Sequence, residues 1–331
     1  MKPTPSPASP MCMGHSRAIG MVTSTFHASS APVAGRVRVP RRLLPCVLLA
    51  AAATGPASAH PADTPPAWAS SAWSLSPWIL VPFALLLCAY ARGLWLLWRR
   101  AGIGHGISTA GASAFALGMT CLWFATIWPL GAYARWSLAP HMAQHMLLLA
   151  LVPPLLLAGQ PQAAIATALP RQANRIVQAV ARRLGRAGSA LAAAAIAHSL
   201  VMWAWHVPAA LTRALAFEPL HWLMHASFLV TGLWYWHALL QRLRDPHTGS
   251  LPALVSMVAV MMQMGLIGAL LTFSPRPLYA IYAWRTAAIG LDPLQDQQLA
   301  GLLMWVPSCL PYLFGAFWLT RRELSRWSRR A

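Results

Sequence analysis

The chain contains seven predominantly apolar segments of about 20 residues each, and this feature restricts its possible folds more than any other. A helix rises about 1.5 Å per residue, so about 20 apolar residues cross the roughly 30 Å of hydrocarbon in a bilayer. The segments are residues 76–98, 107–129, 140–159, 188–208, 218–240, 251–273 and 297–319. The sequence therefore predicts an all-α, polytopic membrane helix bundle with seven transmembrane helices in one domain, residues 76–320.

Composition and charge support a membrane protein and argue against a nucleic-acid partner. Hydrophobic residues make up 57% of the chain and charged residues only 9%, whereas soluble proteins average about 25% charged residues. The formal net charge of +19 taken alone would fit nucleic-acid binding. The basic residues lie in connections and tails, however, so the partner that they imply is the lipid bilayer.

The first sixty residues have the pattern of a targeting segment. Basic residues at 36–42 precede an apolar run at 43–54, and Ala57-Ser58-Ala59 forms a small-x-small cleavage site. We predict a disordered N-terminus with a signal-like segment at 1–59 and an extracytoplasmic segment at 60–75. An uncleaved run would be a short additional anchor.

Arginine counting predicts the orientation. Fifteen arginines fall in one set of alternating connections and tails, and four fall in the other set, namely Arg135, Arg213, Arg276 and Arg285. Basic loops stay in the cytoplasm, so residues 321–331 form a basic cytoplasmic tail. The mature N-terminus then lies outside a bacterial plasma (inner) membrane.

Two His-x-x-x-His pairs begin the third and fifth segments and predict a metal site. Residues four apart project from one side of a helix with Cβ atoms about 5–6 Å apart, so each pair can present two imidazoles to one ion. The orientation places both pairs, and the histidine that ends the fourth segment, in one outer layer. The predicted metal ligands are His141, His145, His206, His221 and His225.

Three further residues are predicted to support this site from behind. His198 and Met202 continue the stripe of His206 along the fourth segment. Asp296, near the start of the seventh segment, is placed to accept an imidazole N–H and fix the ligating tautomer. Below the first pair, Pro153-Pro154 is expected to break the third helix, because neither proline has a backbone N–H to donate.

The residue types limit the chemistry. A single interfacial histidine is more often a hydrogen-bonding residue than a ligand, but two pairs at one depth favour a shared site. Imidazole suits Zn, Cu, Fe and Ni, and methionines beside both pairs favour copper. Hydrolytic motifs such as His-Glu-x-x-His and Gly-x-Ser-x-Gly are missing from the sequence. We therefore expect a binding protein and not an enzyme.

Several motifs, in order, resemble the CtaG family of cytochrome c oxidase assembly factors over residues 75–320. They are HMAQHMLLLALVPPLLLAGQP at 141–161, Trp205-His206-x-Pro208, His221-x-x-x-His225 with Gly232-x-Trp234, and the run from Asp296 to Pro307. The resemblance implies a role in copper supply to, or maturation of, a haem-copper oxidase. The implied partners are oxidase subunits and a periplasmic copper chaperone, and the implied cofactor is copper.

Three alternatives remain open from the sequence. An assembly factor can also act by holding an oxidase subunit, with the histidines serving structure. A haem- or quinol-linked redox protein would place histidines on facing helices as well. A metal permease would need polar residues through the full depth of the membrane, and below His198 the segments are nearly free of charge.

Overall fold

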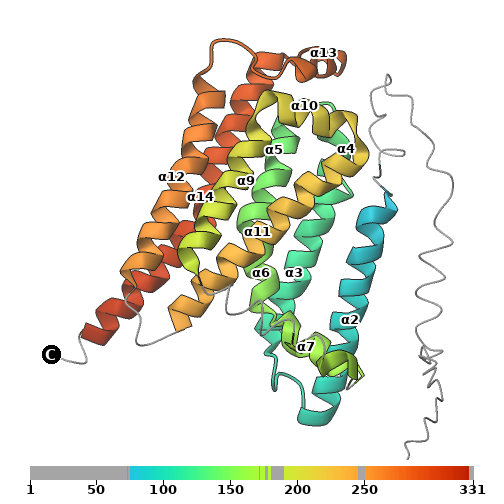
Figure 1. The fold of residues 1–331 in the computed structure, drawn as a ribbon, viewed down its shortest axis with the longest axis vertical. Coiled ribbons are helices and arrows are strands. Elements are labelled where there is room, and N and C mark those ends of the chain that lie inside the picture. The colour runs from blue at the N-terminus through green and yellow to red at the C-terminus, as the bar shows by residue number, and fades with distance from the viewer. Residues whose placement is uncertain are drawn as a thin grey trace, which may run out of the picture. The chain divides into compact units, whose positions relative to one another are not determined.

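The computed structural model describes residues 73, 75–170, 172–175, 178–179, 190–244 and 250–327. Within these ranges every regular element is a helix, and no strand occurs (Figure 1). The predicted segment at 1–59, most of 60–75 and the end of the basic tail lie outside the described residues.

Each of the seven predicted segments coincides with a helix. The helices are α2 (Pro77–Ala101), α3 (Thr109–Thr126), α4 (Leu130–Tyr133), α5 (Leu138–Met146), the π-helix η1 (Leu147–Leu151), α6 (Val152–Ala158), α7 (Pro161–Ala168), α9 (Leu191–His206), α10 (Pro208–Ala216), α11 (Glu218–Arg244), α12 (Leu251–Phe273), α13 (Ala280–Ala288) and α14 (Pro293–Trp327). The all-α prediction is confirmed.

Five helical stretches in the described part of the chain are long and apolar enough to cross a membrane. They are Pro77–Ala101, Thr109–Tyr133, Leu138–Ala158, Leu251–Phe273 and Pro293–Arg321. A sixth is counted only if α9 and α10, which bend by 75°, form one span. The three histidines of α11 lower the mean hydropathy of that helix, and it is not among the five. A membrane-spanning helical protein is thus supported, and the number of seven spans stays a prediction.

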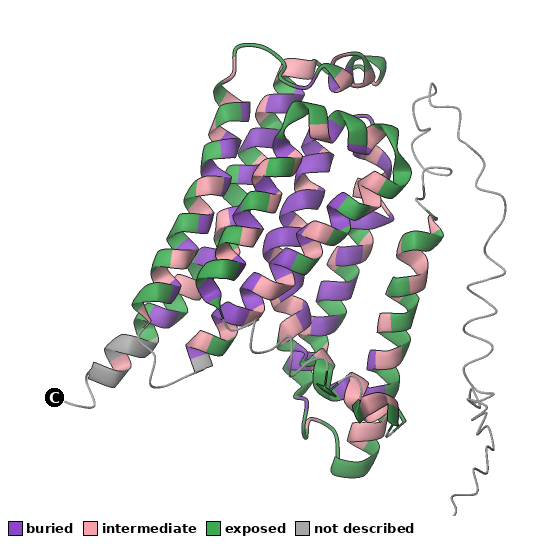
Figure 2. Ribbon diagram, in the orientation of Figure 1, coloured by how far each residue is buried: buried purple, intermediate pink, exposed green. Residues whose placement is uncertain are grey.

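The helix pair α5–α6 lies at the centre of the bundle. Of its most apolar window 61% is buried, against 11% for α2, and Figure 2 shows the buried residues concentrated along α5. Large apolar side chains such as Val258, Leu270 and Phe314 are exposed on outer faces, as lipid contact requires. Any chemistry carried by α5 therefore takes place inside the protein.

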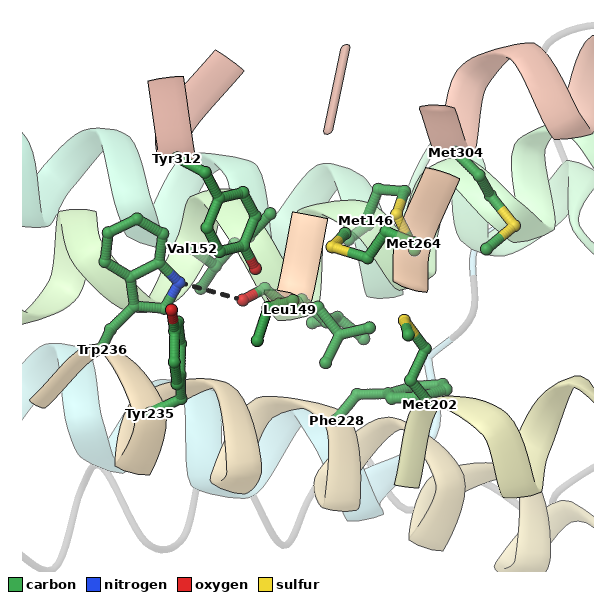
Figure 3. Packing of buried hydrophobic residues seen from close by; sticks show 14 of the residues in the cluster. Met146, Leu149, Val152, Met202, Phe228, Tyr235, Trp236, Met264, Met304 and Tyr312 are labelled. Carbon is green, nitrogen blue, oxygen red and sulfur yellow. Dashed lines mark hydrogen bonds between the residues drawn. The ribbon is translucent and has the colours of Figure 1, made fainter. Parts of the chain in front are cut away.

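The two prolines predicted to break the third helix do not end it. The helix runs on from Leu138 to Ala158 as one span, and the π-helix η1 immediately precedes Pro153. A proline leaves the carbonyl four residues earlier without its usual donor, which here is Leu149. Trp236 Nε1 donates to Leu149 O at 3.2 Å, as Figure 3 shows, so α11 supplies the missing bond.

Small residues allow this contact between α11 and the third helix. A Cβ on Gly232 would lie 2.8 Å from Pro153 Cγ and 3.1 Å from the carbonyl oxygens of Leu148 and Leu149. Any larger residue would push α11 away from η1. The close approach fixes the depth at which α11 lies beside α5, and therefore the relative height of their histidine pairs.

Candidate metal centre

The structure brings all five predicted ligands into one cluster. His141 and His145 lie on the first turns of α5, His221 and His225 on the first turns of α11, and His206 ends α9. Within the two pairs the ring centroids are 4.5 Å and 4.4 Å apart. Between helices, His141 lies 5.7 Å from His221, and His145 lies 6.1 Å from His225 and 5.3 Å from His206.

Most of the ring nitrogens in this cluster have no hydrogen-bond partner. Four of the five histidines are fully or nearly fully buried. The buried nitrogens without a partner are His141 Nε2, both nitrogens of His145, His206 Nε2 and both nitrogens of His225. Leaving a buried polar group unsatisfied costs about 1–3 kcal/mol. Such a concentration of unsatisfied groups indicates that these nitrogens are positioned to bind a ligand.

The donor set fits a metal ion. One nitrogen from each of His141, His145 and His225 lies within 4.8 Å of the other two. A neutral imidazole offers one lone pair, and three converging lone pairs in a buried space are the arrangement that a transition metal recognises. His206 and His221 adjoin this trio and bring the available imidazoles to five.

Hydrogen bonds at Nδ1, on the side of the ring opposite the free Nε2, set the tautomer of two of these histidines. His206 Nδ1 lies 2.6 Å from Met202 O, one turn back on α9. His141 Nδ1 lies 3.2 Å from Ala134 O and 2.8 Å from the Tyr282 hydroxyl. A carbonyl oxygen can only accept, so in both rings the proton belongs on Nδ1. The lone pair of each ring is then on Nε2, the atom that has no other partner.

Of the two predicted supporting residues on α9, Met202 contacts the cluster and His198 does not. Met202 contributes its backbone carbonyl to His206, and its side chain is buried. The ring of His198 packs against Tyr235, with centroids 5.2 Å apart, deeper in the bundle. No ring contact joins His198 to the five clustered histidines among the described residues.

Asp296 corrects the prediction made for it. Its hydrogen bonds come from Ser137 Oγ (2.5 Å), Leu138 N (2.7 Å), Ala139 N (3.2 Å) and Thr286 Oγ1 (3.3 Å), and none comes from an imidazole. Its buried carboxylate thus receives the free N–H groups at the start of α5, where a negative charge is favourable. Asp296 fixes the helix that carries His141 and His145, and it does not touch either ring.

Sequence reasoning missed the helix that covers the site. Three hydroxyls of α13 and its N-cap reach the site's backbone: Tyr279 donates to His206 O at 2.8 Å, Tyr282 donates to Ala134 O, and Thr286 donates to Trp136 O at 3.1 Å. Burial raises the pKa of both tyrosines, so they remain protonated donors. The i, i+3, i+7 spacing of these residues marks one helix face and could have revealed α13.

The fold and this site define a polytopic helical membrane protein with a candidate metal centre enclosed between its helices. The chain belongs to the family of cytochrome c oxidase caa3 assembly factors (Caa3_CtaG), whose sequence profile matches residues 88–329. The match includes the whole histidine cluster and confirms the resemblance predicted from the motifs. No curated protein and no solved structure matches the chain.

Proposed function

We propose that the protein binds copper as cargo in its histidine cluster and hands it to a cytochrome c oxidase during assembly. The observation that carries this proposal is the convergence of buried imidazole nitrogens that have no hydrogen-bond partner. The family supports the oxidase as partner. The chemistry of the donors supports copper, since imidazole binds Cu well and thioether sulfur favours Cu(I). Met142 and Met224, both fully buried, lie in the helical segments that carry the two histidine pairs.

The excess of ligands suits transfer better than permanent storage. Three imidazoles lie close enough together to hold one ion, and two more adjoin them. An ion can then exchange one imidazole for another, or for a ligand of a partner protein, without losing all of its protein ligands at any point. This is the behaviour of a carrier and needs no catalytic residue.

The direction of transfer follows from the predicted orientation. The arginine asymmetry places the cluster near the outer face of a bacterial plasma membrane, with residues 321–331 in the cytoplasm. A signal-like segment at 1–59 and an extracytoplasmic segment at 60–75 belong to the same proposal. Copper would come from a periplasmic chaperone and leave for an oxidase subunit on that side.

The other candidate functions have less support. A haem needs a flat slot between its axial ligands, whereas neighbouring rings here contact each other at 4.4–6.3 Å between centroids. A permease needs a polar path, but the interior below the cluster is filled by Met, Leu, Phe, Tyr and Trp (Figure 3).

Metal analysis of the purified protein tests the proposal. The full-length protein and a His145→Ala/His225→Ala variant are loaded with Cu(I), desalted and analysed for copper per chain. We expect near-stoichiometric copper in the parent and a loss of at least about tenfold in the variant, because two ligands are removed and a loss of only about 1.4 kcal/mol in binding free energy weakens affinity tenfold. His105→Ala, an exposed histidine between α2 and α3, is the matched control and should retain its copper.

The same variants, expressed in cells, distinguish copper delivery from a role in which the protein only binds an oxidase subunit. If the protein delivers copper, the double variant should yield oxidase that lacks copper while its subunits accumulate normally. Unchanged copper per chain in His145→Ala/His225→Ala, with folding intact, would contradict the site.

A further inference from the structure

One member of the histidine cluster is open to the surface, and this defines the entrance. His221 is half-buried, whereas His141, His145, His206 and His225 are buried. A ligand that brings or removes an ion therefore meets His221 first. The side chains around His221 decide which ligands can approach.

Two arginines flank this entrance. Arg135 is exposed and follows Ala134, whose carbonyl contacts His141. Its positive charge acts electrostatically on His221. Arg285 lies on α13, one turn after Tyr282, whose hydroxyl also contacts His141. Both cations are thus tied to the residues that orient one of the ligands.

The structure holds Arg285 against the backbone of Arg135. Arg285 Nη1 donates to Arg135 O at 3.2 Å, and its guanidinium lies 5.3 Å from the centre of the Trp284 ring. Trp284 in turn packs edge-on against Trp136, with centroids 6.3 Å apart. Burial lowers the pKa of Arg285; the nearby Tyr282 opposes this effect, and the positive charge of Arg135 adds to it.

No carboxylate in the described ranges forms a salt bridge with either arginine. Asp296 is occupied by the start of α5, and Asp292 accepts from Gln295 N at 3.2 Å. Glu218 accepts from Trp222 Nε1 at 3.1 Å, although it is near enough to feel the charge of Arg135. Two neighbouring arginines that form no salt bridge in the described ranges, beside the opening of a metal cluster, can still bind an incoming carboxylate.

We propose that Arg135 and Arg285 form a docking site for the carboxylate groups of an acidic copper donor or acceptor, placed so that its copper ligands meet His221. This inference rests on the proposed function and names the chemistry of the partner. The guanidinium pair attracts an acidic domain and fixes its approach. The same two charges attract an anionic ligand and not a neutral one, which favours transfer of the copper ion to an anionic ligand.

Ligand exchange with small chelators tests the proposal on the full-length protein. Copper(I)-loaded protein in phosphatidylcholine nanodiscs is mixed with bicinchoninate, which carries two carboxylates, or with neocuproine, which is uncharged, and the rate of copper removal is recorded. In the parent the ratio of the two rates should favour bicinchoninate and fall with added salt. In Arg135→Gln/Arg285→Gln this ratio should fall about tenfold, the lower end of electrostatic steering effects, with copper per chain unchanged.

Control variants make the test specific. Arg213→Gln/Arg276→Gln removes two exposed arginines from the same side of the protein and should leave the ratio unchanged. Arg135→Lys/Arg285→Lys keeps both charges and should retain most of the preference. The proposal is overturned if the Arg135→Gln/Arg285→Gln ratio equals that of the parent, if the control pair falls equally, or if the double variant no longer holds copper at equilibrium.

Two further outcomes are distinguishable. A parent protein that holds no copper would refute the proposed function, and this inference with it. If phosphatidylglycerol in the nanodiscs removes the bicinchoninate preference of the parent and leaves the ratio of Arg135→Gln/Arg285→Gln unchanged, the two arginines are ligands of lipid phosphates, and the docking proposal is wrong.

Discussion

Two interhelical regions of this bundle differ in what fills the space between the helices. Where α12 meets α14, the backbones approach directly: a Cβ on Gly268 would lie 2.8 Å from Gly301 O, and the Thr272 hydroxyl beside this contact is satisfied within α12 by Gly268 O at 2.9 Å. Where α5, α9 and α11 meet, the space is filled by imidazole rings, and most of their nitrogens have no hydrogen-bond partner. The first region is satisfied and close-packed, and the second is close-packed but unsatisfied.

The difference separates stability from function. Small residues at a helix contact increase van der Waals packing, which is a main source of helix association in lipid. Buried imidazoles with free nitrogens do the opposite, since each carries a desolvation cost. The protein thus keeps an unfavourable group of side chains at its centre and offsets it with tight contacts elsewhere. Volume changes should damage the first region, and changes of polarity should damage the second.

Gly268→Leu should produce the largest effect. Overpacking costs about 1–3 kcal/mol and occasionally more, and here the obstacle is the backbone of Gly301, which cannot move aside like a flexible side chain. We expect little folded protein, measured as the monodisperse fraction in size-exclusion chromatography after mild extraction. Ala259→Leu, on an exposed position of the same helix, should behave as the parent, and equal yields of the two variants would show that the close approach is unimportant.

Asp296→Asn should have the next largest effect, and it joins the two regions because α14 carries this residue to the start of α5. Hydrogen bonds to a charged group contribute about 1.5–3 kcal/mol, and the amide keeps only one acceptor oxygen for four donors. We expect a lower free energy of unfolding by about 2 kcal/mol and weaker copper binding, since α5 loses its anchor. Asp292→Asn, an exposed neighbour, is the control. If copper affinity is unchanged while stability falls, Asp296 does not position the ligands.

His145→Leu should change stability in the opposite direction. Neither ring nitrogen of His145 has a partner, and the ring lies against Phe228 at 4.5 Å between centroids. Replacing it with an apolar residue should raise the free energy of unfolding of the copper-free protein by about 1–2 kcal/mol. The melting temperature should rise accordingly. Added copper should stabilise the parent but not the variant. A destabilised copper-free variant would mean that His145 serves the fold.

Tyr282→Phe should have the smallest effect. It removes one hydroxyl from Ala134 O and His141 Nδ1 while keeping the ring. The expected loss is about 1 kcal/mol of stability, together with a several-fold weaker copper affinity because the His141 tautomer is less well fixed. Competition with a Cu(I) chelator measures the second quantity. An affinity equal to that of the parent would assign Tyr282 to the covering helix alone.

Much of the fold and the core of the site were predictable because their signals are periodic. Apolar runs located all seven long helical segments, and i, i+4 spacing placed each histidine pair on one helix face. The arginine asymmetry assigned both pairs to one side. These inferences depend on local geometry that a membrane helix cannot easily change.

The features that sequence reasoning missed depend on contacts between distant segments. The hydrogen bond from Ser137 to Asp296 joins residues 159 positions apart, and no local pattern predicts it. The role of Tyr282 depends on α13 folding back over α5. The prolines were correctly seen as a disturbance of the third helix, but whether they end it depended on Trp236, a donor on another helix.

The π-helix at Leu147–Leu151 also determines which way the histidines face. A π-helical turn contains one residue more than an α-helical turn, so the side chains above it face about 100° away from the direction that an unbroken α-helix of the same sequence would give them. The upper and lower parts of this membrane helix can therefore follow packing patterns that are one residue out of phase. If Leu147–Leu151 formed a regular α-helix of the same length, His141 and His145 would be directed away from the rings of α11.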